Sequence, residues 1–471
     1  MDSNSSKSLL NSKYKKSEIE GLPNSLFTDN RNRFFKNVKA KFPTLPSKSV
    51  MVIQGGSDLP RFDTDVEHCY FLQESNFYYL TGVRLPDFYA VFDFDNQDVT
   101  LFTHILPDDY KVWMTVLGVD EISKKYELKV LETKSMYSHL ASLNLNKIYT
   151  IEGTNTDSGI KYKVADLKFP EEFKEVEKLV EVSELLYEIV VDTRVIKSAE
   201  EIEVLTFVND ITVDSHIEML KQLRPGLMER DIEVAFSGGI NQKYYSRNFP
   251  YQYICCSGVD SATLHYQKND SVLKDGDLLL FDMGARISGY VSDVTSTAPV
   301  NGKFTKKQAD IYNLVLKANL TVQSKLKPGI SWPDMHLLAE SVILEGLLDL
   351  NILNKGFSIQ EMLDRRIAYN FMPHGLGHLL GLEVHDAGGY LSFTPKRHTP
   401  VGLKNLRFAR VLEEGYFITV EPGIYFVKFL LERAFADEQI NKYFNTELIR
   451  TYFDFGGVRI EDDIIITKDG S

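Results

Sequence analysis

The feature that most constrains the fold is a set of acidic and histidine side chains at the ends of apolar segments in the second half of the chain. They are Asp282 in LLLFDMG, Asp293 in GYVSDVT, His378 in HGLGH, Glu421 in FITVEPG and Glu461 in GVRIEDD. Four carboxylates and one imidazole that converge on one spot repel each other unless cations lie between them. Two divalent ions carry four positive charges, which balance four carboxylates. The fold is therefore expected to gather these segments around two metal ions, and metal-assisted hydrolysis is the first hypothesis.

The two aspartates are expected to lie on one β-hairpin. The segment DLLLFDMGARISGYVSDVTSTAPV predicts two strands joined by a tight turn. A turn centred on residues 287–288 pairs position 282 with position 293, and directly opposed side chains have Cβ atoms about 5 Å apart. Two opposed aspartates destabilise a hairpin unless a cation lies between them. Taken alone, however, the hairpin fits better as a pair of surface aspartates near strand ends.

Three of the ten histidines fall within HGLGHLLGLEVHDAGG, at His374, His378 and His385. An HxxxH pattern on a helix would suggest zinc, but Gly375 and Gly377 argue against a helix here. Any one of these histidines could be a core residue that is hydrogen-bonded to the backbone. Three of them around the apolar LLGLEV favour a functional cluster.

The last two acidic candidates lie in strand-like segments. Glu421 ends an apolar strand before a turn, where a buried glutamate needs a partner, although it could also cap the turn. In GGVRIEDDIIIT, strand alternation places Arg459, Glu461 and Asp463 on one face. That face could equally be a solvated charged surface.

The type of ligand narrows the choice of metal. A site rich in oxygen with one imidazole and no cysteine suits Mn²⁺ first, with Zn²⁺, Co²⁺ or Fe²⁺ as alternatives. Two such ions about 3.5–4 Å apart can bridge a water, lower its pKa and polarise a carbonyl oxygen.

Length and charge limit the classes of protein to which the chain can belong. At 471 residues it exceeds one ordinary core, so two domains are expected. The net charge of −13 argues against nucleic-acid binding, and no window approaches about 18 uninterrupted apolar residues, which argues against a membrane span. The cysteines, Cys69, Cys255 and Cys256, show no CxxC spacing, and the polar N-terminus has no apolar signal segment. Reduced thiols and a cytoplasmic location are therefore expected.

The order of predicted elements suggests an α/β (α+β) chain with three parts. Residues 1–21 are Ser/Asn/Lys-rich and predict a flexible tail. Residues 22–196 alternate strand-like and helix-like stretches, with strands expected at 89–95, 99–106 and 146–153 and a helix at 111–126. Residues 197–471 form the second domain. It opens with a helix that Ser198 and Glu201 cap reciprocally and that stops before Pro225-Gly226.

These motifs, in this order, resemble the prolidase and aminopeptidase P branch of the metallopeptidases with the pita-bread fold. The similarity covers residues 50–471 and is closest to eukaryotic prolidases, the Xaa-Pro dipeptidases. Segments that match the family text are FLQESNFYYLTGV, LPDFYAVFD, EGTNTDSG, LHYQKND, LLFDMG, NGKFT, KPGISWPDMH, FMPHGLGHLLGLEVHDAGGY, FITVEPGIYF and FGGVRIEDD. The resemblance implies an N-terminal mixed-sheet α/β domain of the aminopeptidase P type. It also implies a pita-bread catalytic domain, a curved antiparallel sheet flanked by helices.

The resemblance also assigns roles to individual residues. It implies that the metal ligands are Asp282, Asp293, His378, Glu421 and Glu461. Glu421 would also assist proton transfer, while His385 would contact the substrate and stabilise the tetrahedral intermediate.

Four further residues match family positions around the substrate. His265, in TLHYQ, matches a histidine near the substrate, and Arg407, in LRFAR, matches the arginine that holds the C-terminal carboxylate of the dipeptide. Arg459 matches an arginine that lines the site, and Tyr251 aligns with a pocket tyrosine.

The activity implied is hydrolysis of Xaa-Pro dipeptides by a hydroxide that bridges two Mn²⁺ ions, in a homodimer. The alternatives are an aminopeptidase P that acts on longer peptides, an inactive pita-bread binding module and creatine hydrolysis. Residues 428–457 resemble the prolidase insertion, which speaks against aminopeptidase P. All five ligands are kept, which speaks against the other two alternatives. Family members usually continue with a further strand and a helix, so the stop at Ser471 predicts that closing elements are absent.

Overall fold

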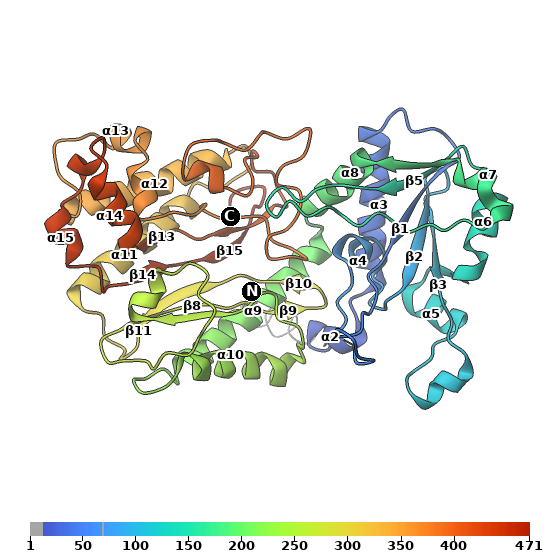
Figure 1. Ribbon diagram of the computed structural model, residues 1–471, viewed down its shortest axis with the longest axis horizontal. Helices are drawn as coiled ribbons and strands as arrows, with labels where there is room; N and C mark the ends of the chain where they lie inside the picture. Colours follow the sequence, from blue (N-terminus) through green and yellow to red (C-terminus); the bar gives the residue numbers. More distant parts are fainter. Residues whose placement is uncertain (1–12, 68–69) are drawn as a thin grey trace. The chain divides into compact units, whose positions relative to one another are not determined.

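The computed structural model describes residues 13–67 and 70–471 and contains two compact units (Figure 1). One unit spans Leu22–Arg194. The other comprises the described residues before Leu22 together with Val195–Ser471. The division falls between residues 194 and 195, close to the boundary expected before 197.

The unit Leu22–Arg194 is built on one mixed sheet with strand order β4-β3-β2-β1-β5-β6. Its strands are β1 (Ser49–Gln54), β2 (Phe88–Asp93), β3 (Asp98–Thr103), β4 (Lys129–Glu132), β5 (Lys147–Ile151) and β6 (Val180–Ser183). The β1–β2 and β2–β3 pairs are antiparallel, and the other pairs are parallel. The turn between β2 and β3 is fixed by Asp93, whose Oδ1 accepts the backbone N–H groups of Asp95 and Asn96 (both 3.0 Å). The expected mixed sheet is confirmed.

Helices surround this sheet, and the apolar residues of the strands form a core with them. The helices are α3 (Asn24–Lys41), α4 (Ser75–Thr81), α5 (Val119–Tyr126), α6 (Met136–Ser142), α7 (Lys174–Glu177) and α8 (Glu184–Val195), with 3₁₀ turns η1 (Asp108–Val112), η2 (Thr133–Ser135) and η3 (Glu171–Phe173). One buried cluster joins Val50, Val91, Phe102 and Ile148 of four strands to Met136 of α6.

The single helix expected over residues 111–126 is wrong in its first half. The structure has only the short turn η1 there, and α5 begins after Gly118, whose N–H donates to Glu121 Oε2 (2.8 Å). Val112 and Trp113 are 80% and 82% exposed, so these apolar side chains do not pack on the unit to which they belong. Without that packing a short helix gains too little to form.

The second unit is built from short antiparallel strands that follow one another around a curved surface. They are β7 (Ile254–Ser257), β8 (Leu278–Asp282), β9 (Arg286–Ile287), β10 (Tyr290–Val291), β11 (Thr295–Pro299), β12 (Phe417–Val420), β13 (Gly423–Tyr425), β14 (Gly457–Arg459) and β15 (Asp462–Ile465). The pairings are β11-β8-β7, β10-β9, β12-β15 and β13-β14. Backbone bonds join these groups to one another and to the histidine segment: Glu461 N–H donates to Thr295 O (3.0 Å), and Val291 N–H donates to Gly381 O (2.9 Å).

Helices cover this surface on two sides (Figure 1). The helices are α2 (Ser17–Glu20), α9 (Ala199–Leu220), α10 (Glu229–Tyr244), α11 (Lys306–Gln323), α12 (Trp332–Asp349), α13 (Ile359–Asp364), α14 (Lys428–Ala436) and α15 (Thr446–Arg450), with 3₁₀ turns η4 (Gly258–Ala262), η5 (Ile367–Asn370), η6 (Leu403–Asn405) and η7 (Asn441–Tyr443). α9 contacts β10 and α10 contacts β7, whereas α11 contacts β12, β13 and β14. α9 begins with the expected capping box between Ser198 and Glu201. The arrangement is the expected pita-bread architecture.

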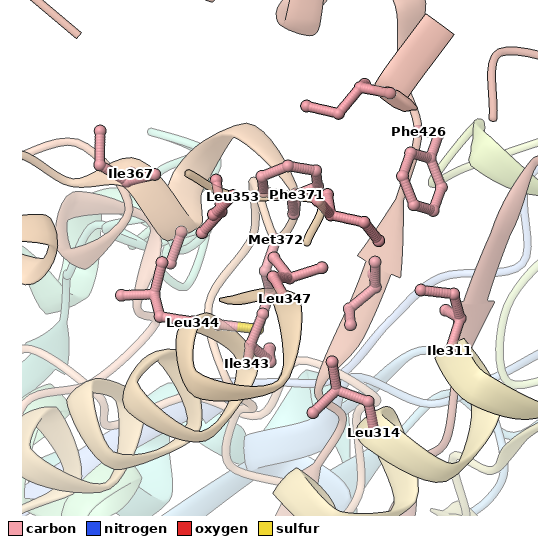
Figure 2. Packing of buried hydrophobic residues seen from close by; sticks show 14 of the residues in the cluster. Ile311, Leu314, Ile343, Leu344, Leu347, Leu353, Ile367, Phe371, Met372 and Phe426 are labelled. Atoms are coloured by element: carbon pink, nitrogen blue, oxygen red, sulfur yellow. The ribbon is translucent and has the colours of Figure 1, made fainter. Parts of the chain in front are cut away.

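A large apolar core of this unit lies between α11, α12 and the strands that precede and follow the insertion (Figure 2). Ile311 and Leu314 of α11 face Ile343 and Leu347 of α12, and Phe426 closes the cluster just after β13 (Figure 2). Fully burying an aliphatic or aromatic side chain contributes about 1.5–3 kcal/mol, so this cluster holds the strands of the site rigidly.

The register expected for the aspartate hairpin is wrong by two residues. Asp282 pairs with Thr295, not with Asp293. The turn is centred on Ser288-Gly289, not on residues 287–288, because both residues adopt positive φ (48° and 91°), as in a type I′ turn. A serine at the first of these positions is an unusual choice, so the sequence did not signal the turn.

The flexible tail expected over residues 1–21 is not borne out where the structure describes it. Residues 1–12 lie outside the described residues, as does Cys69. Tyr14 is 1% exposed, and its ring lies 5.8 Å from that of Phe207, while Glu18 accepts the N–H of Ser288 (2.6 Å). None of the helices in residues 13–67 and 70–471 has the length and apolar character that crossing a membrane demands.

Candidate metal and active site

The aspartate hairpin places both carboxylates on one face. Asp282 ends β8, and Asp293 lies two residues before Thr295, the partner of Asp282, so the two side chains are diagonal neighbours. A Cβ at Gly284 would lie 1.9 Å from the Ser292 carbonyl oxygen, so only glycine lets the two strands approach here. Asp282 and Asp293 are 8% and 6% exposed.

His378 is held against β12 by the backbone. Its N–H donates to Thr419 Oγ1 (3.0 Å), and its carbonyl accepts the N–H of Thr419 (3.0 Å). Its Nδ1 lies 3.1 Å from the carbonyl oxygen of Leu379 and donates to it in the tautomer that leaves Nε2 unprotonated. A backbone bond at one ring nitrogen typically orients the other toward a metal. Nε2 lies 3.3 Å from Asp293 Oδ2 and 3.5 Å from Glu421 Oε1.

The remaining carboxylates come from the two strand pairs β12-β15 and β13-β14. Glu421 directly follows β12, and its Oε1 accepts from Thr419 Oγ1 (3.3 Å). Glu461 lies between β14 and β15 and is 3% exposed. Its Oε2 accepts from Thr295 Oγ1 (2.5 Å), which ties it to the aspartate hairpin.

One buried arginine shares this space with the acids. Arg459 donates from Nη2 to Asp282 Oδ2 (2.7 Å), from Nε to Thr295 Oγ1 (3.0 Å) and from Nη1 to the hydroxyl of Tyr425 (3.0 Å). Tyr251 donates to the other oxygen of Asp282 (2.8 Å). Both oxygens of Asp282 are therefore oriented by donors.

These side chains line one pocket of about 80 Å³. The lining consists of Leu264, His265, Asp282, Asp293, His374, His378, His385, Glu421, Arg459 and Glu461. Ligand atoms of Asp293, His378 and Glu461 lie within 4.8 Å of one another. The structure thus brings together all five expected metal ligands.

The pocket opposes the build-up of negative charge. Burial, followed by the charge of Asp293, raises the pKa of Asp282 to about 7. Burial and the neighbouring acids also raise the pKa of Glu461 well above its usual range, and burial raises that of Glu421. Burial also disfavours the anion of Asp293, but the hydrogen bond and charge of His378 outweigh it and lower the pKa. Cations are what would allow all four acids to ionise together.

The donor set fits divalent cations. Asp293 Oδ1 is buried and has no hydrogen-bond partner among the described residues, which a buried oxygen rarely tolerates unless an unseen ion or water satisfies it. His378 presents Nε2 toward the same acids. Four carboxylates with one imidazole suit hard or borderline ions.

The other expected site residues lie around this centre. His265 and His385 line the pocket, and the His385 ring lies 4.6 Å from that of His378 at a near-perpendicular angle. Tyr251 lies behind Asp282, as its hydrogen bond shows. Arg407 does not line the pocket but lies near it. Burial, and then positive charges that include Arg407, lower the pKa of His385 to about 2 and also lower that of His265.

Sequence reasoning assigned no role to several supporting residues. Thr295 and Thr419 orient Glu461 and Glu421 through hydroxyls, and Asp463 Oδ2 accepts the backbone N–H of Asp293 (2.9 Å). His374 Nε2 lies 3.1 Å from the hydroxyl of Tyr425, which links it to Arg459. The only signal for the threonines was their position two residues from a ligand on the same strand face.

Two family models match the chain. The model described as metallopeptidase family M24 matches residues 203–468, and the model described as aminopeptidase P, N-terminal domain, matches residues 27–149. The M24 model therefore falls within Val195–Ser471, and the aminopeptidase P model falls within Leu22–Arg194.

Individual proteins are similar over most of the chain. The Xaa-Pro dipeptidase of Mus musculus is 40% identical over 95% of this chain and 90% of that protein. The probable Xaa-Pro aminopeptidase pepP of Sclerotinia sclerotiorum is 38% identical over 85% of this chain and 70% of that protein. The solved structure of Zn-substituted E. coli aminopeptidase P in complex with product has a TM-score of 0.74, at 26% identity over 95% of this chain and 94% of that chain.

Proposed function

The chain belongs to metallopeptidase family M24, and we propose that it is an enzyme that hydrolyses Xaa-Pro dipeptides with two divalent metal ions. The observation that carries the proposal is the single pocket in which Asp282, Asp293, His378, Glu421 and Glu461 converge. When bound, two such ions would lower the pKa of a water and polarise the scissile carbonyl. A relative that had become an inactive binding module would be expected to lose some of these ligands.

Two residues are proposed to assist the chemistry. Burial raises the pKa of Glu421, which suits a carboxylate that takes up and returns a proton. Burial, and then the charges of His378 and Arg407, lower the pKa of His385 to about 2, so its imidazole is neutral at physiological pH. A neutral imidazole can still donate one N–H to the oxygen on which negative charge develops.

Other residues are proposed to hold the dipeptide. Arg407 would bind the free carboxylate of the proline through two parallel hydrogen bonds. Its charge acts on both His265 and His385, which supports a place beside the bound substrate. His265, at the pocket lining, would contact the dipeptide, while Arg459 and Tyr251 would orient Asp282.

The second candidate is an aminopeptidase P that cleaves longer peptides, because solved structures of that activity resemble the chain closely. The helical segment from α14 to α15, between Glu421 and Glu461, supports the dipeptidase instead, since it resembles the prolidase insertion. Mn²⁺ is the proposed metal, given the oxygen-rich ligand set. A homodimer is proposed on the resemblance alone, and a cytoplasmic location is proposed on the sparse cysteines.

The test compares Gly-Pro with the tripeptide Gly-Pro-Ala, using Mn²⁺-loaded and chelated enzyme. We expect metal-dependent cleavage of Gly-Pro and little cleavage of the tripeptide. The variant Arg407→Ala should lower kcat/KM for Gly-Pro roughly 30-fold or more, because truncating one partner of a buried charge pair costs about 2–5 kcal/mol. Its metal content should stay unchanged, because Arg407 is not a ligand.

The control is Arg433→Ala on α14, which removes the same charge outside the pocket and should leave kcat/KM unchanged. Faster cleavage of the tripeptide by the wild type would favour aminopeptidase P. If Arg407→Ala lowers kcat/KM equally for both substrates, this residue does not bind the free carboxylate of the dipeptide.

A further inference from the structure

His265 lies on a loop at the edge of the pocket, and it is the backbone of this loop that sets the position of the side chain. The imidazole lines the pocket but is exposed, at the end of the segment that follows η4. Among residues 13–67 and 70–471, no hydrogen bond or ion pair is made by its ring. The position of the ring therefore depends on how firmly the backbone of residues 258–271 is held.

The strongest anchor of this loop is a buried glutamate outside the pocket. Glu229 is the first residue of α10 and is fully buried. Its Oε1 accepts the N–H (2.7 Å) and hydroxyl (2.8 Å) of Ser257, just before the loop. Its Oε2 accepts the hydroxyl of Tyr266 (3.0 Å) and the N–H of Ser271 (3.0 Å). One carboxylate thus holds both ends of the loop and the residue directly after His265.

Other bonds also hold the loop, including a longer one between the hydroxyls of Tyr266 and Ser271 (3.4 Å). Asn269, which adopts a positive φ of 47°, accepts the N–H of Cys255 (3.0 Å) and donates to the carbonyl of Tyr253 (2.8 Å). Ser261 accepts the N–H of Gly457 (2.9 Å). The bond from Tyr266 to Glu229 is the shorter of the two that lie nearest to the imidazole along the chain.

We propose that Glu229 is a positioning residue that fixes His265 at the pocket through Tyr266, Ser257 and Ser271. The inference rests on the proposed function, in which His265 contacts the dipeptide. Glu229 is suited to this role because both of its oxygens accept two donors, which saturates a carboxylate. A glutamine cannot replace it, because its NH₂ group would face a backbone N–H of Ser257 or Ser271 and leave that donor unpaired.

The experiment has an activity arm and an arm that needs no activity. In the metal-loaded enzyme, Glu229→Gln should lower kcat/KM for Gly-Pro about tenfold, since small displacements of substrate-positioning groups have effects of this order or larger. In a His265→Ala background the same change should lower kcat/KM less than about twofold, because residues that act as a unit are not additive. Hydrogen exchange of residues 258–271 should become at least about tenfold faster in Glu229→Gln.

The control is Glu201→Gln, which alters another buried glutamate of the same unit, one that bonds to Ser198 and Tyr290 instead of this loop. It should change neither the hydrogen exchange of residues 258–271 nor the loss of kcat/KM that His265→Ala causes. If Glu229→Gln does not fold, Tyr266→Phe removes only one donor and should show the same two effects at smaller size.

The outcomes separate the two claims. The role of Glu229 would be overturned if Glu229→Gln lowered kcat/KM equally with and without His265. Unchanged hydrogen exchange of residues 258–271 would overturn it too. A His265→Ala variant with full activity would overturn it as well. If the wild type does not cleave Gly-Pro, the proposed function falls, and the exchange measurement still decides whether Glu229 holds the loop.

Discussion

Replacing Gly377 by alanine should disable the site without touching a ligand. A Cβ at this position would lie 2.0 Å from the carbonyl oxygen of Thr419, and this neighbour is backbone that cannot swing away. An ordinary contact begins at 3.4 Å, so the two segments must separate by the difference, 1.4 Å. That separation acts on His378, the next residue, and on its bonds to Thr419.

The size of the effect follows from the bonds that this separation breaks. His378 and Thr419 exchange two hydrogen bonds of 3.0 Å, and Leu380 N–H donates to Phe417 O (3.0 Å) on the same strand. At about 1 kcal/mol each, their loss costs about 2–3 kcal/mol, which in a unit of this size lowers the melting temperature by roughly 3–5 °C. Disturbing the support of a metal ligand typically lowers metal affinity about 10–100-fold. We therefore expect about 100-fold lower kcat/KM at limiting metal, with partial recovery at excess metal.

The assay combines thermal melting, elemental analysis and Gly-Pro hydrolysis. The matched control is Gly238→Ala on α10, where a Cβ meets nothing within 4 Å. This control should be unchanged in activity and up to about 1 kcal/mol more stable, because alanine favours a helix. A Gly377→Ala enzyme with wild-type melting temperature and metal content would refute the steric argument.

The remaining predictions concern the charges of the pocket. In metal-free protein, the pKa of Asp282 is raised to about 7, above its usual value of 3.8, so the protonated acid favours the folded state. That contribution is complete below about pH 4 and is lost as the pH rises to 7. Melting of chelated protein should therefore occur at lower temperature at pH 8 than at pH 5.5, and metal should remove most of this difference; equal melting curves at the two pH values would contradict it. Tyr251→Phe removes one donor to Asp282 and should lower kcat/KM about tenfold while the fold, followed by circular dichroism, stays intact. Unchanged kinetics would show that this hydroxyl does not orient the ligand.

The ligands could be predicted from the sequence because each has a local signal. Asp282 ends an apolar strand, Glu421 directly follows one, and Gly375 and Gly377 mark an extended segment around His378. Such signals depend on a few neighbouring residues, as does the capping box of α9. Together with the family resemblance they predict the ligand set, while each local signal alone also fits a capping or surface residue.

What the sequence did not reveal depends on contacts between distant segments. The turn at Ser288-Gly289 shifts the hairpin register, and a serine with positive φ is not a turn signal. Thr295 bonds to Glu461 across 166 positions, and no local pattern predicts such a pair. Residues 112–113 look helical but remain exposed, because propensity without packing does not form a helix.

The structure also changes the charge balance on which the sequence argument was based. Four carboxylates were matched to two divalent cations, but Arg459 is buried among them and bonds directly to Asp282. With two such cations and the attacking hydroxide present, Arg459 would bring the charge of the pocket to zero, and Arg407 nearby would give the field one excess positive charge. A cavity with this excess attracts a substrate with a free carboxylate and gains less from one whose carboxylate lies further along the peptide. The preference for dipeptides is thus expected to depend on the charge of the whole pocket as well as on the bond to a single arginine.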